Sequence, residues 1–264
     1  MGRAGRRPGR SSPAQVVAKL FFVRRRRRGR RRGAWRRLRA RIPAALLVLA
    51  LAGLWISRSP PPPDAPDDLC AIYQQRLSWY RDSRDAAARW AVAEPMIMAI
   101  LFQESGLRAT IRPPRRRYLG FIPGPLPSSA YGYAQAVDAT WRQFQVEAGR
   151  RASRRSFTDA VEFVAWYSAE LVGVLGLSRT DVESLYLAYH EGPGGYARGS
   201  HLAKPEVRRS ARRVAARAAR FESQLASCRS ALDRRLRWHA FGLWLAAAAL
   251  AGAAALVAWR RLRR

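Results

Sequence analysis

A single glutamate lies at the end of an apolar run in the first half of the chain. The run is MIMAILFQESG (residues 96–106), and Glu104 is its only acid. Leu101, Ile100 and Ile97 lie three, four and seven positions before Glu104, on the same face of a helix. Burial and the carboxyl-terminal end of a helix both disfavour a charged carboxylate and raise its pKa. Glu104 could therefore act as a general acid near neutral pH. The alternative is a side chain that reaches solvent at a frayed helix end.

Two later blocks place polar and aromatic side chains close together. The first is AYGYAQAVDATW (residues 130–141), and the second is YLAYHEGPGGY (residues 186–196), which contains a further carboxylate at Glu191. No other His, Cys or Asp lies at metal-ligand spacing from His190 or Glu191. The sequence therefore predicts a site without a metal or cofactor.

The segments around these blocks have helical patterns. We expect helices over residues 69–92, 95–105, 137–149, 157–176 and 181–191, and one more from Pro205. A capping box at Thr180–Glu183 begins the fifth helix, and Gly192 ends it. The last helix has one continuous apolar face, which indicates core packing: Val207, Ala211, Val214, Ala218, Phe221, Leu225 and Cys228. No strand pattern is evident, so the sequence predicts an all-α domain.

Charge and hydropathy divide the chain into a central domain and two ends that contain possible membrane segments. The net charge of the 264 residues is +31, and residues 1–41 contain seventeen basic side chains and no acid. An apolar segment at residues 42–57 fits either a short anchor or the core of a signal peptide. No small-residue cleavage site follows it, which favours an uncleaved anchor. Residues 238–259 are apolar, with tryptophan at both ends, as in a transmembrane helix.

The basic ends predict the orientation of the chain. Basic flanks stay in the cytoplasm, so residues 1–41 and 260–264 should be cytoplasmic and the domain between the apolar segments should be outside. A proline-rich linker (residues 58–68) would hold a domain over residues 69–230 away from the bilayer. The arginine runs at 24–28 and 30–32 could bind nucleic acid. Next to a membrane segment, contact with anionic lipid is favoured, and no base-reading motif accompanies the arginines.

The two cysteines lie near the two edges of the predicted outer domain. An oxidising compartment favours a disulfide between Cys70 and Cys228, which would join the first and last helices. Two buried free thiols are the alternative.

The segments FQESG, AYGYAQAVDATW and YLAYHEGPGGY together resemble the three signature blocks of the SLT-type lytic transglycosylases. The closest resemblance is to small membrane-anchored members with an AYHEG block, and it covers roughly Cys70 to Cys228. It implies a lysozyme-like helical transglycosylase domain, here flanked by N- and C-terminal membrane segments. It also implies a location at the bacterial inner (cytoplasmic) membrane, with the catalytic domain facing the periplasm or cell wall.

The family resemblance implies a role for each matching residue. Glu104 matches the family's sole acid/base, which cleaves the bond between N-acetylmuramic acid and N-acetylglucosamine in peptidoglycan and forms a 1,6-anhydro ring. One acid without a nucleophilic partner is unusual among glycosidases and fits this chemistry. The residues that match positions near the substrate are Ser105, Tyr133, Gln135, Tyr189, His190 and Glu191.

Two positions depart from the commoner family pattern. His190 replaces an asparagine and Glu191 replaces an alanine. Glu191 could position a water, as in a lysozyme-type hydrolase, or it could cap a helix or pair with an arginine. The second alternative is favoured, and an ionised carboxylate nearby would help to keep Glu104 protonated. His190 could titrate near neutrality, although a hydrogen bond to a loop carbonyl is favoured.

The long segment at residues 108–129 is rich in proline and arginine. Arg115–Arg117 could attract the carboxylates of glycan and peptide stems, or they could belong to a solvated loop. Tyr118, Tyr131, Tyr133 and Tyr196 could offer flat faces to sugars, although each is singly more typical of partly buried packing. A non-catalytic peptidoglycan-binding scaffold is the remaining alternative to an enzyme.

Overall fold

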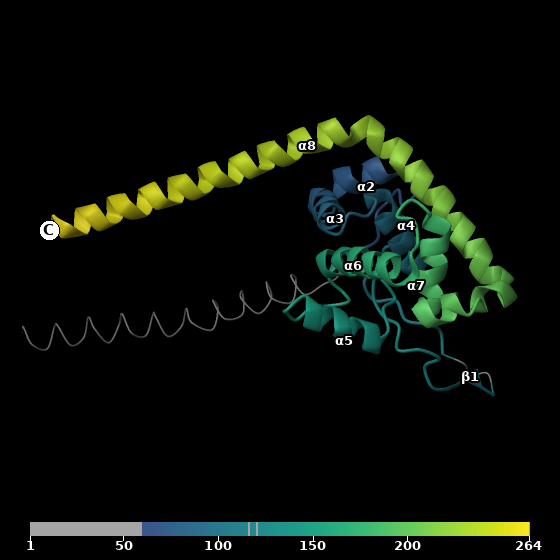
Figure 1. The fold of residues 1–264 in the computed structure, drawn as a ribbon. Coiled ribbons are helices and arrows are strands. Elements are labelled where there is room, and N and C mark those ends of the chain that lie inside the picture. The colour runs from purple at the N-terminus through teal and green to yellow at the C-terminus, as the bar shows by residue number, and fades with distance from the viewer. Residues whose placement is uncertain (1–59, 116, 120, 264) are drawn as a thin grey trace, which may run out of the picture. The chain divides into compact units, whose positions relative to one another are not determined.

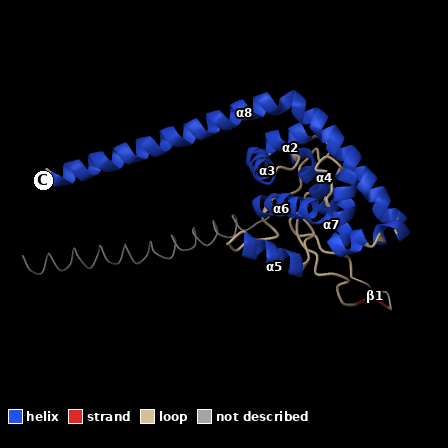
Figure 2. Ribbon diagram, in the orientation of Figure 1, coloured by secondary structure: helices blue, strands red, loops and turns tan. Residues whose placement is uncertain are grey.

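The computed structural model describes residues 60–115, 117–119 and 121–263 (Figure 1). The described helices are α2 (Leu69–Gln75), α3 (Leu77–Trp90), α4 (Glu94–Ser105), α5 (Asp138–Glu147), α6 (Phe157–Leu175), α7 (Val182–Ala197), the 3-10 helix η1 (Ser200–Ala203) and α8 (Pro205–Leu262). The only strands in the described part are β1 (Arg117–Tyr118) and β2 (Ile122–Pro123), an antiparallel hairpin within a long loop (Figure 2). The all-α prediction is confirmed. The predicted basic tail and first apolar segment lie outside the described residues.

Two helix boundaries differ from those expected, and the N-cap of α7 is Asp181 and not Thr180, because the Asp181 side chain accepts a hydrogen bond from the backbone N–H of Ser184 at 3.0 Å. The helix predicted over residues 69–92 is divided at Arg76, whose φ of −134° and ψ of 76° are not helical. Neither proline nor glycine marks this break in the sequence. At the second position, Gly192 does interrupt α7, with φ 72° and ψ 164°, but helical structure resumes after it and continues to Ala197. Pro193 then occupies the first position of the resumed helix, where its missing N–H costs nothing.

Helix α4 forms the centre of the core. Each residue from Met96 to Leu101 has 0% exposed surface. The helix contacts α3, α6 and α8, so it is buried on all sides and not only along the face that the sequence suggested. Its last turn carries Glu104, and Gly106 ends it in the left-handed conformation with φ 59°. This buried helix therefore places one acid at the point where the helix leaves the core.

The first half of α8 covers this core. All seven residues of the predicted apolar face are buried, from Val207 to Cys228, and the helix packs on α2, α4 and α7. From Arg237 onward the described side chains of α8 are exposed. Among the described residues, α8 alone is long and apolar enough to cross a membrane, and its apolar window is not covered by the rest of the protein. The predicted segment at residues 238–259 lies within this helix.

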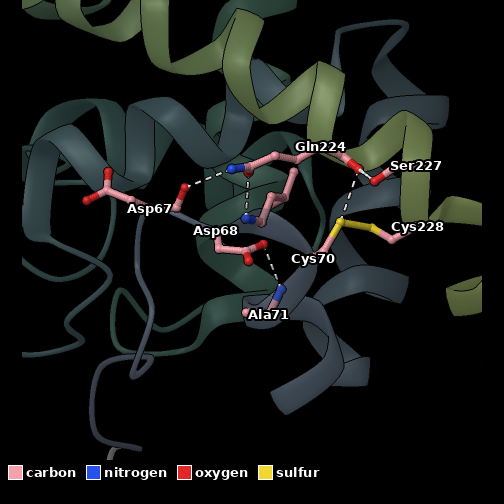
Figure 3. The surroundings of a disulfide bond; sticks show 8 residues. Asp67, Asp68, Cys70, Ala71, Gln224, Ser227 and Cys228 are labelled. Atoms are coloured by element: carbon pink, nitrogen blue, oxygen red, sulfur yellow. Dashed lines mark hydrogen bonds between the residues drawn. A yellow bond between two sulfur atoms is a disulfide. The ribbon is translucent and has the colours of Figure 1, made fainter.

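The predicted disulfide is confirmed. Cys70 of α2 and Cys228 of α8 are bonded, across a sequence separation of 158 residues (Figure 3). The side chain of Gln224 lies beside it and accepts a hydrogen bond from the backbone N–H of Leu69 at 2.9 Å. The same amide donates to the carbonyl oxygen of Asp67 at 3.1 Å. The start of the domain is thereby fixed to α8 by one covalent bond and two hydrogen bonds.

Candidate active site

A cleft of about 540 Å³ opens where α4, the loop after it, α5, α6 and α7 meet. Five predicted site residues line this cleft: Glu104, Gln135, Tyr189, His190 and Glu191. Much of the remaining lining is apolar or aromatic, with Phe163 and Tyr167 from α6 and Pro113 from the loop. A cleft that combines apolar and aromatic walls with convergent polar groups is typical of a ligand site.

The carboxyl group of Glu104 is sheltered from water at this cleft. Its Oε1 atom is buried and has no hydrogen-bond partner. Burial raises the pKa of Glu104 to about 7, and a hydrogen-bonding interaction with Tyr186 acts in the opposite direction. The direction agrees with the expectation from the sequence. A carboxyl group with this pKa can give up a proton and recover it near neutral pH.

Two tyrosines of α7, Tyr186 and Tyr189, lie near Glu104. Tyr189 donates a hydrogen bond to the carbonyl oxygen of Ala134 at 2.7 Å, and its ring meets that of Tyr167 edge-on at 5.4 Å. Tyr186, three residues earlier on the same helical face, interacts with Glu104 itself. Tyr186 and Tyr167 were not predicted from the sequence. The spacing of three residues between Tyr186 and Tyr189 is the signal that could have identified Tyr186.

The amide of Gln135 holds the cleft loop together. Its Nε2 atom donates to the carbonyl oxygens of Ile111, at 3.0 Å, and Gly132, at 2.8 Å. Both amide protons are thus used within the protein, and Oε1 remains as the atom that can accept a hydrogen bond from a ligand. Any contact of Gln135 with substrate therefore uses the side chain as an acceptor.

Gly132 cannot be replaced without loss of stability. Its φ is +80°, and a Cβ atom added there would lie 2.1 Å from the carbonyl oxygen of Arg154. We expect Gly132→Ala to lower the free energy of unfolding by at least about 3 kcal/mol, because backbone must move. Denaturant unfolding of the full chain in detergent measures this effect. Gly149→Ala is the matched control, since Gly149 also has positive φ, at 62°, but nothing within 4 Å of the added atom. Equal losses in both variants would contradict the steric explanation.

Ser105 and Tyr133 do not line the cleft, contrary to the expectation that they contact substrate. Ser105 is 3% exposed, and its hydroxyl donates back to the carbonyl oxygen of Leu101 at 3.1 Å. Tyr133 is fully buried and packs edge-on against Trp79 and Phe157, at 5.8 and 5.6 Å. Both residues belong to the packing behind the cleft.

Glu191 is engaged by a cation and a hydroxyl group. Its side chain is only 3% exposed. Lys204 donates to both carboxylate oxygens, at 3.0 and 2.8 Å, Ser200 donates to one of them, and Nδ1 of His190 lies 3.1 Å from the other. Burial acts to raise the pKa of Glu191, but these hydrogen bonds, led by that of Lys204, outweigh burial and lower it to about 2. Glu191 thus pairs with a cation, though with a lysine and not an arginine.

Two expectations about this pair of residues are wrong. His190 interacts with the carboxylate of Glu191 and not with a loop carbonyl. Burial is what raises the pKa of Glu104, and Glu191 makes no contribution to it. The negative charge of Glu191 is balanced by the positive charge of Lys204, which limits its effect on Glu104.

The Glu191–Lys204 pair joins the kink of α7 to the start of α8. We expect Lys204→Met to lower the free energy of unfolding by about 2 kcal/mol at pH 7, because it leaves a buried carboxylate without its cation. The pKa of Glu191 is lowered from 4.5 to about 2, so its stabilising contribution is present above pH 4.5 and is lost as the pH falls through 2. The difference between wild type and variant should therefore shrink over that range. Urea unfolding at several pH values measures it, with Lys204→Arg as the charge-preserving control.

Three of the tyrosines that could have offered faces to sugars, although packing was favoured for each, lie outside the cleft. Tyr118 is exposed on the hairpin, Tyr196 stacks on His201 at 4.9 Å, and Tyr131 lies under the guanidinium group of Arg112 at 4.2 Å. None of them lines the cleft, where Tyr167, Tyr189 and Phe163 supply the aromatic surface. Of the predicted arginine run, residue 116 lies outside the described part of the chain. Within that part, no group of three His, Cys, Asp or Glu side chains is arranged to hold a metal ion.

Comparison with known families agrees with this arrangement. Residues 46–228 match the family model of the transglycosylase SLT domain. A search of curated proteins finds no match. The matched region covers more than half of the chain and includes the helical domain, the cleft and Glu104. The chain therefore belongs to the transglycosylase SLT domain family, a family of lytic transglycosylases with a lysozyme-like helical fold that act on peptidoglycan.

Proposed function

We propose that the protein is a membrane-anchored lytic transglycosylase with Glu104 as its sole acid/base. It cleaves the β-1,4 bond between N-acetylmuramic acid and N-acetylglucosamine and leaves a 1,6-anhydro product. The observation that carries this proposal is the state of Glu104: a sheltered carboxyl group at a cleft, with one unpartnered oxygen and a pKa of about 7.

In the first step, the protonated Glu104 donates its proton to the bridging oxygen, and the bond from that oxygen to C1 of the muramic sugar breaks. The Glu104 carboxylate then removes the proton from the C6 hydroxyl group of the same sugar. O6 bonds to C1, the anhydro ring closes and Glu104 is protonated again. The interaction with Tyr186 stabilises the carboxylate between the two steps, because it favours the charged form.

A lysozyme-type hydrolase is the second candidate, because Glu191 also lines the cleft. A general base that activates water must be free to accept a proton. Glu191 is held by Lys204 and Ser200, and its pKa is about 2. A carboxylate with so low a pKa is a weak base. This favours attack by the C6 hydroxyl group over attack by water.

A non-catalytic scaffold is the third candidate. Burial of a carboxyl group with one unpartnered oxygen costs stability, and binding alone gives no reason to retain it. The presence of Glu104 at the cleft therefore favours an enzyme.

The anchoring of the domain follows from its two ends. The exposed apolar window of α8 would span the inner membrane, with residues 42–57 as a second anchor and the basic tails in the cytoplasm. The tail over residues 1–41 would contact anionic lipid, and not nucleic acid. The catalytic domain would then lie on the periplasmic or cell-wall side, where peptidoglycan is found.

Product analysis tests the proposed function. The full chain, purified in detergent, is incubated with peptidoglycan sacculi, and the soluble products are identified by mass spectrometry. Muropeptides with 1,6-anhydro ends are the expected result. Products with reducing ends would show hydrolysis, and the absence of soluble products would favour the scaffold.

A further inference from the structure

One arginine, next in sequence to a residue of the cleft, lies over an aromatic ring and has no charged partner among the described residues. Arg112 directly precedes Pro113, which lines the cleft, and its side chain is exposed. Its guanidinium group lies 4.2 Å from the centre of the Tyr131 ring. Among the described residues, no carboxylate pairs with Arg112. A cation held over an aromatic ring and left unpaired is available to bind an anion.

The backbone around Arg112 is held by the same loop that forms the cleft. The carbonyl oxygen of Ile111 accepts hydrogen bonds from the backbone N–H of Gly132, at 3.1 Å, and from the amide of Gln135, at 3.0 Å. Tyr131 pairs with Ala136 in an isolated antiparallel β-bridge, and Ala136 lines the cleft. The backbone before Arg112 and the backbone of Tyr131 are thus both held by bonds within the loop. A binding group that is already positioned loses less entropy when a ligand binds.

A second arginine near the same ring has a structural role, because its donors bind other parts of the loop. Arg154 lies 5.9 Å from the centre of the Tyr131 ring. It donates to the carbonyl oxygens of Ser129 and Ala136, both at 2.9 Å, and pairs with Asp138. Its donors are used in holding the loop. Arg112 makes no such bonds among the described residues.

The charge of Arg112 is not cancelled by nearby acids. Residues 105–137 contain no acid at all, and Asp138 is paired with Arg154. Of the two acids of the cleft, Glu104 has a pKa of about 7 and Glu191 is balanced by Lys204. The loop side of the cleft therefore presents net positive charge to a substrate.

We propose that Arg112, held over Tyr131, binds a carboxylate of the peptide stems that branch from the glycan strand, and so makes stem-bearing strands with free carboxylates the preferred substrate. This inference rests on the proposed function. The sugars of the backbone are uncharged when their lactyl groups carry stems, so the stems supply the anionic groups of the polymer. A planar guanidinium group binds a carboxylate through two parallel hydrogen bonds, which a lysine cannot reproduce.

The test compares two forms of the same substrate. Soluble stem-bearing strands are used either intact or after conversion of their carboxylates into carboxamides with a carbodiimide and excess ammonia. For the full chain in detergent, Arg112→Gln should lower kcat/KM on the intact strands about tenfold and leave the amidated strands unchanged within about twofold. Arg112→Lys should give an intermediate loss on the intact strands. Arg212→Gln, an exposed arginine of α8, removes the same charge away from the cleft loop and should change neither value.

Each outcome bears on the inference separately from the proposed function. If wild type cuts intact and amidated strands equally well, or if Arg112→Gln slows both to the same extent, the inference is overturned and the proposed function stands. Equal losses in Arg112→Gln and Arg212→Gln would show general charge attraction and would also overturn it. A wild-type chain that cuts neither substrate overturns the proposed function, and this inference with it.

Discussion

Replacement of Glu104 by glutamine is expected to slow the release of anhydro-muropeptides from sacculi by about a thousandfold. Glutamine keeps the shape of the side chain but can neither donate the proton to the bridging oxygen nor remove the one on the C6 hydroxyl group. General acid–base catalysis by one group contributes about 10² to 10⁴ in rate, and here one group performs both steps. The measurement is the initial rate of product release by the full chain in detergent at pH 6.

Glu206→Gln provides the matched control for this substitution. Glu206 is an exposed glutamate in the first turn of α8, and the chemical replacement, a carboxyl group by a carboxamide, is the same. The control should retain the wild-type rate. A Glu104→Gln variant that keeps more than about a tenth of the wild-type rate would remove Glu104 from the mechanism, because other groups would then carry the proton.

The same pKa predicts how rate and stability depend on pH. Because the reaction needs protonated Glu104, the rate should fall about tenfold for each pH unit above about 7. The pKa is raised from 4.5 in the unfolded chain to about 7 in the folded one, so the stability linked to this group is fully present below pH 4.5 and is lost as the pH rises to 7. The loss is about 3 kcal/mol.

Glu104→Gln avoids this loss because glutamine does not ionise. The variant should be more stable than wild type at pH 8 and equally stable at pH 4, as measured by urea unfolding in detergent. An inactive variant that is more stable than wild type cannot owe its inactivity to unfolding. Equal stability at both pH values would contradict the raised pKa.

The parts of the fold that the sequence predicts are those set by regular spacing. The alternation of apolar residues from Val207 to Cys228 predicts the buried face of α8, because a helix brings every third or fourth residue to one side. The apolar run before Glu104 likewise predicts a buried helix that ends in an acid. The cysteine pair is predicted from its position and compartment, and Cys70 is indeed bonded to Cys228.

The cleft loop is the part that the sequence could not predict. Its conformation depends on contacts between residues far apart in sequence, such as that of the Gln135 amide with Ile111, and no local pattern encodes them. A motif also gives the identity of a residue but not its direction. Tyr133 and Tyr189 both matched the family blocks, yet the first packs in the core and only the second lines the cleft.

Loss of the disulfide is expected to have the largest effect on stability. Cys70 and Cys228 close a loop with a sequence separation of 158 residues, and in the chain-entropy model such a bond stabilises the folded state by about 5 kcal/mol. The double variant Cys70→Ala/Cys228→Ala should therefore unfold at a much lower urea concentration than wild type. Replacement of both cysteines avoids a free thiol that could react elsewhere. An unchanged midpoint would show that the hydrogen bonds of Gln224 hold α2 against α8 without the covalent bond.

The disulfide and the catalytic group should be separable in their effects. Cys228 lies 24 residues along α8 from Lys204, which corresponds to about 35 Å of helix. Lys204 is the residue that binds Glu191 at the cleft, and α4 places Glu104 from within the core. At low temperature, where the double variant is still folded, its kcat should thus match that of wild type, and only its tolerance to heat and urea should fall. A lower kcat in the folded double variant would mean that the bond helps to position the cleft, because α8 contacts both α2 and α7.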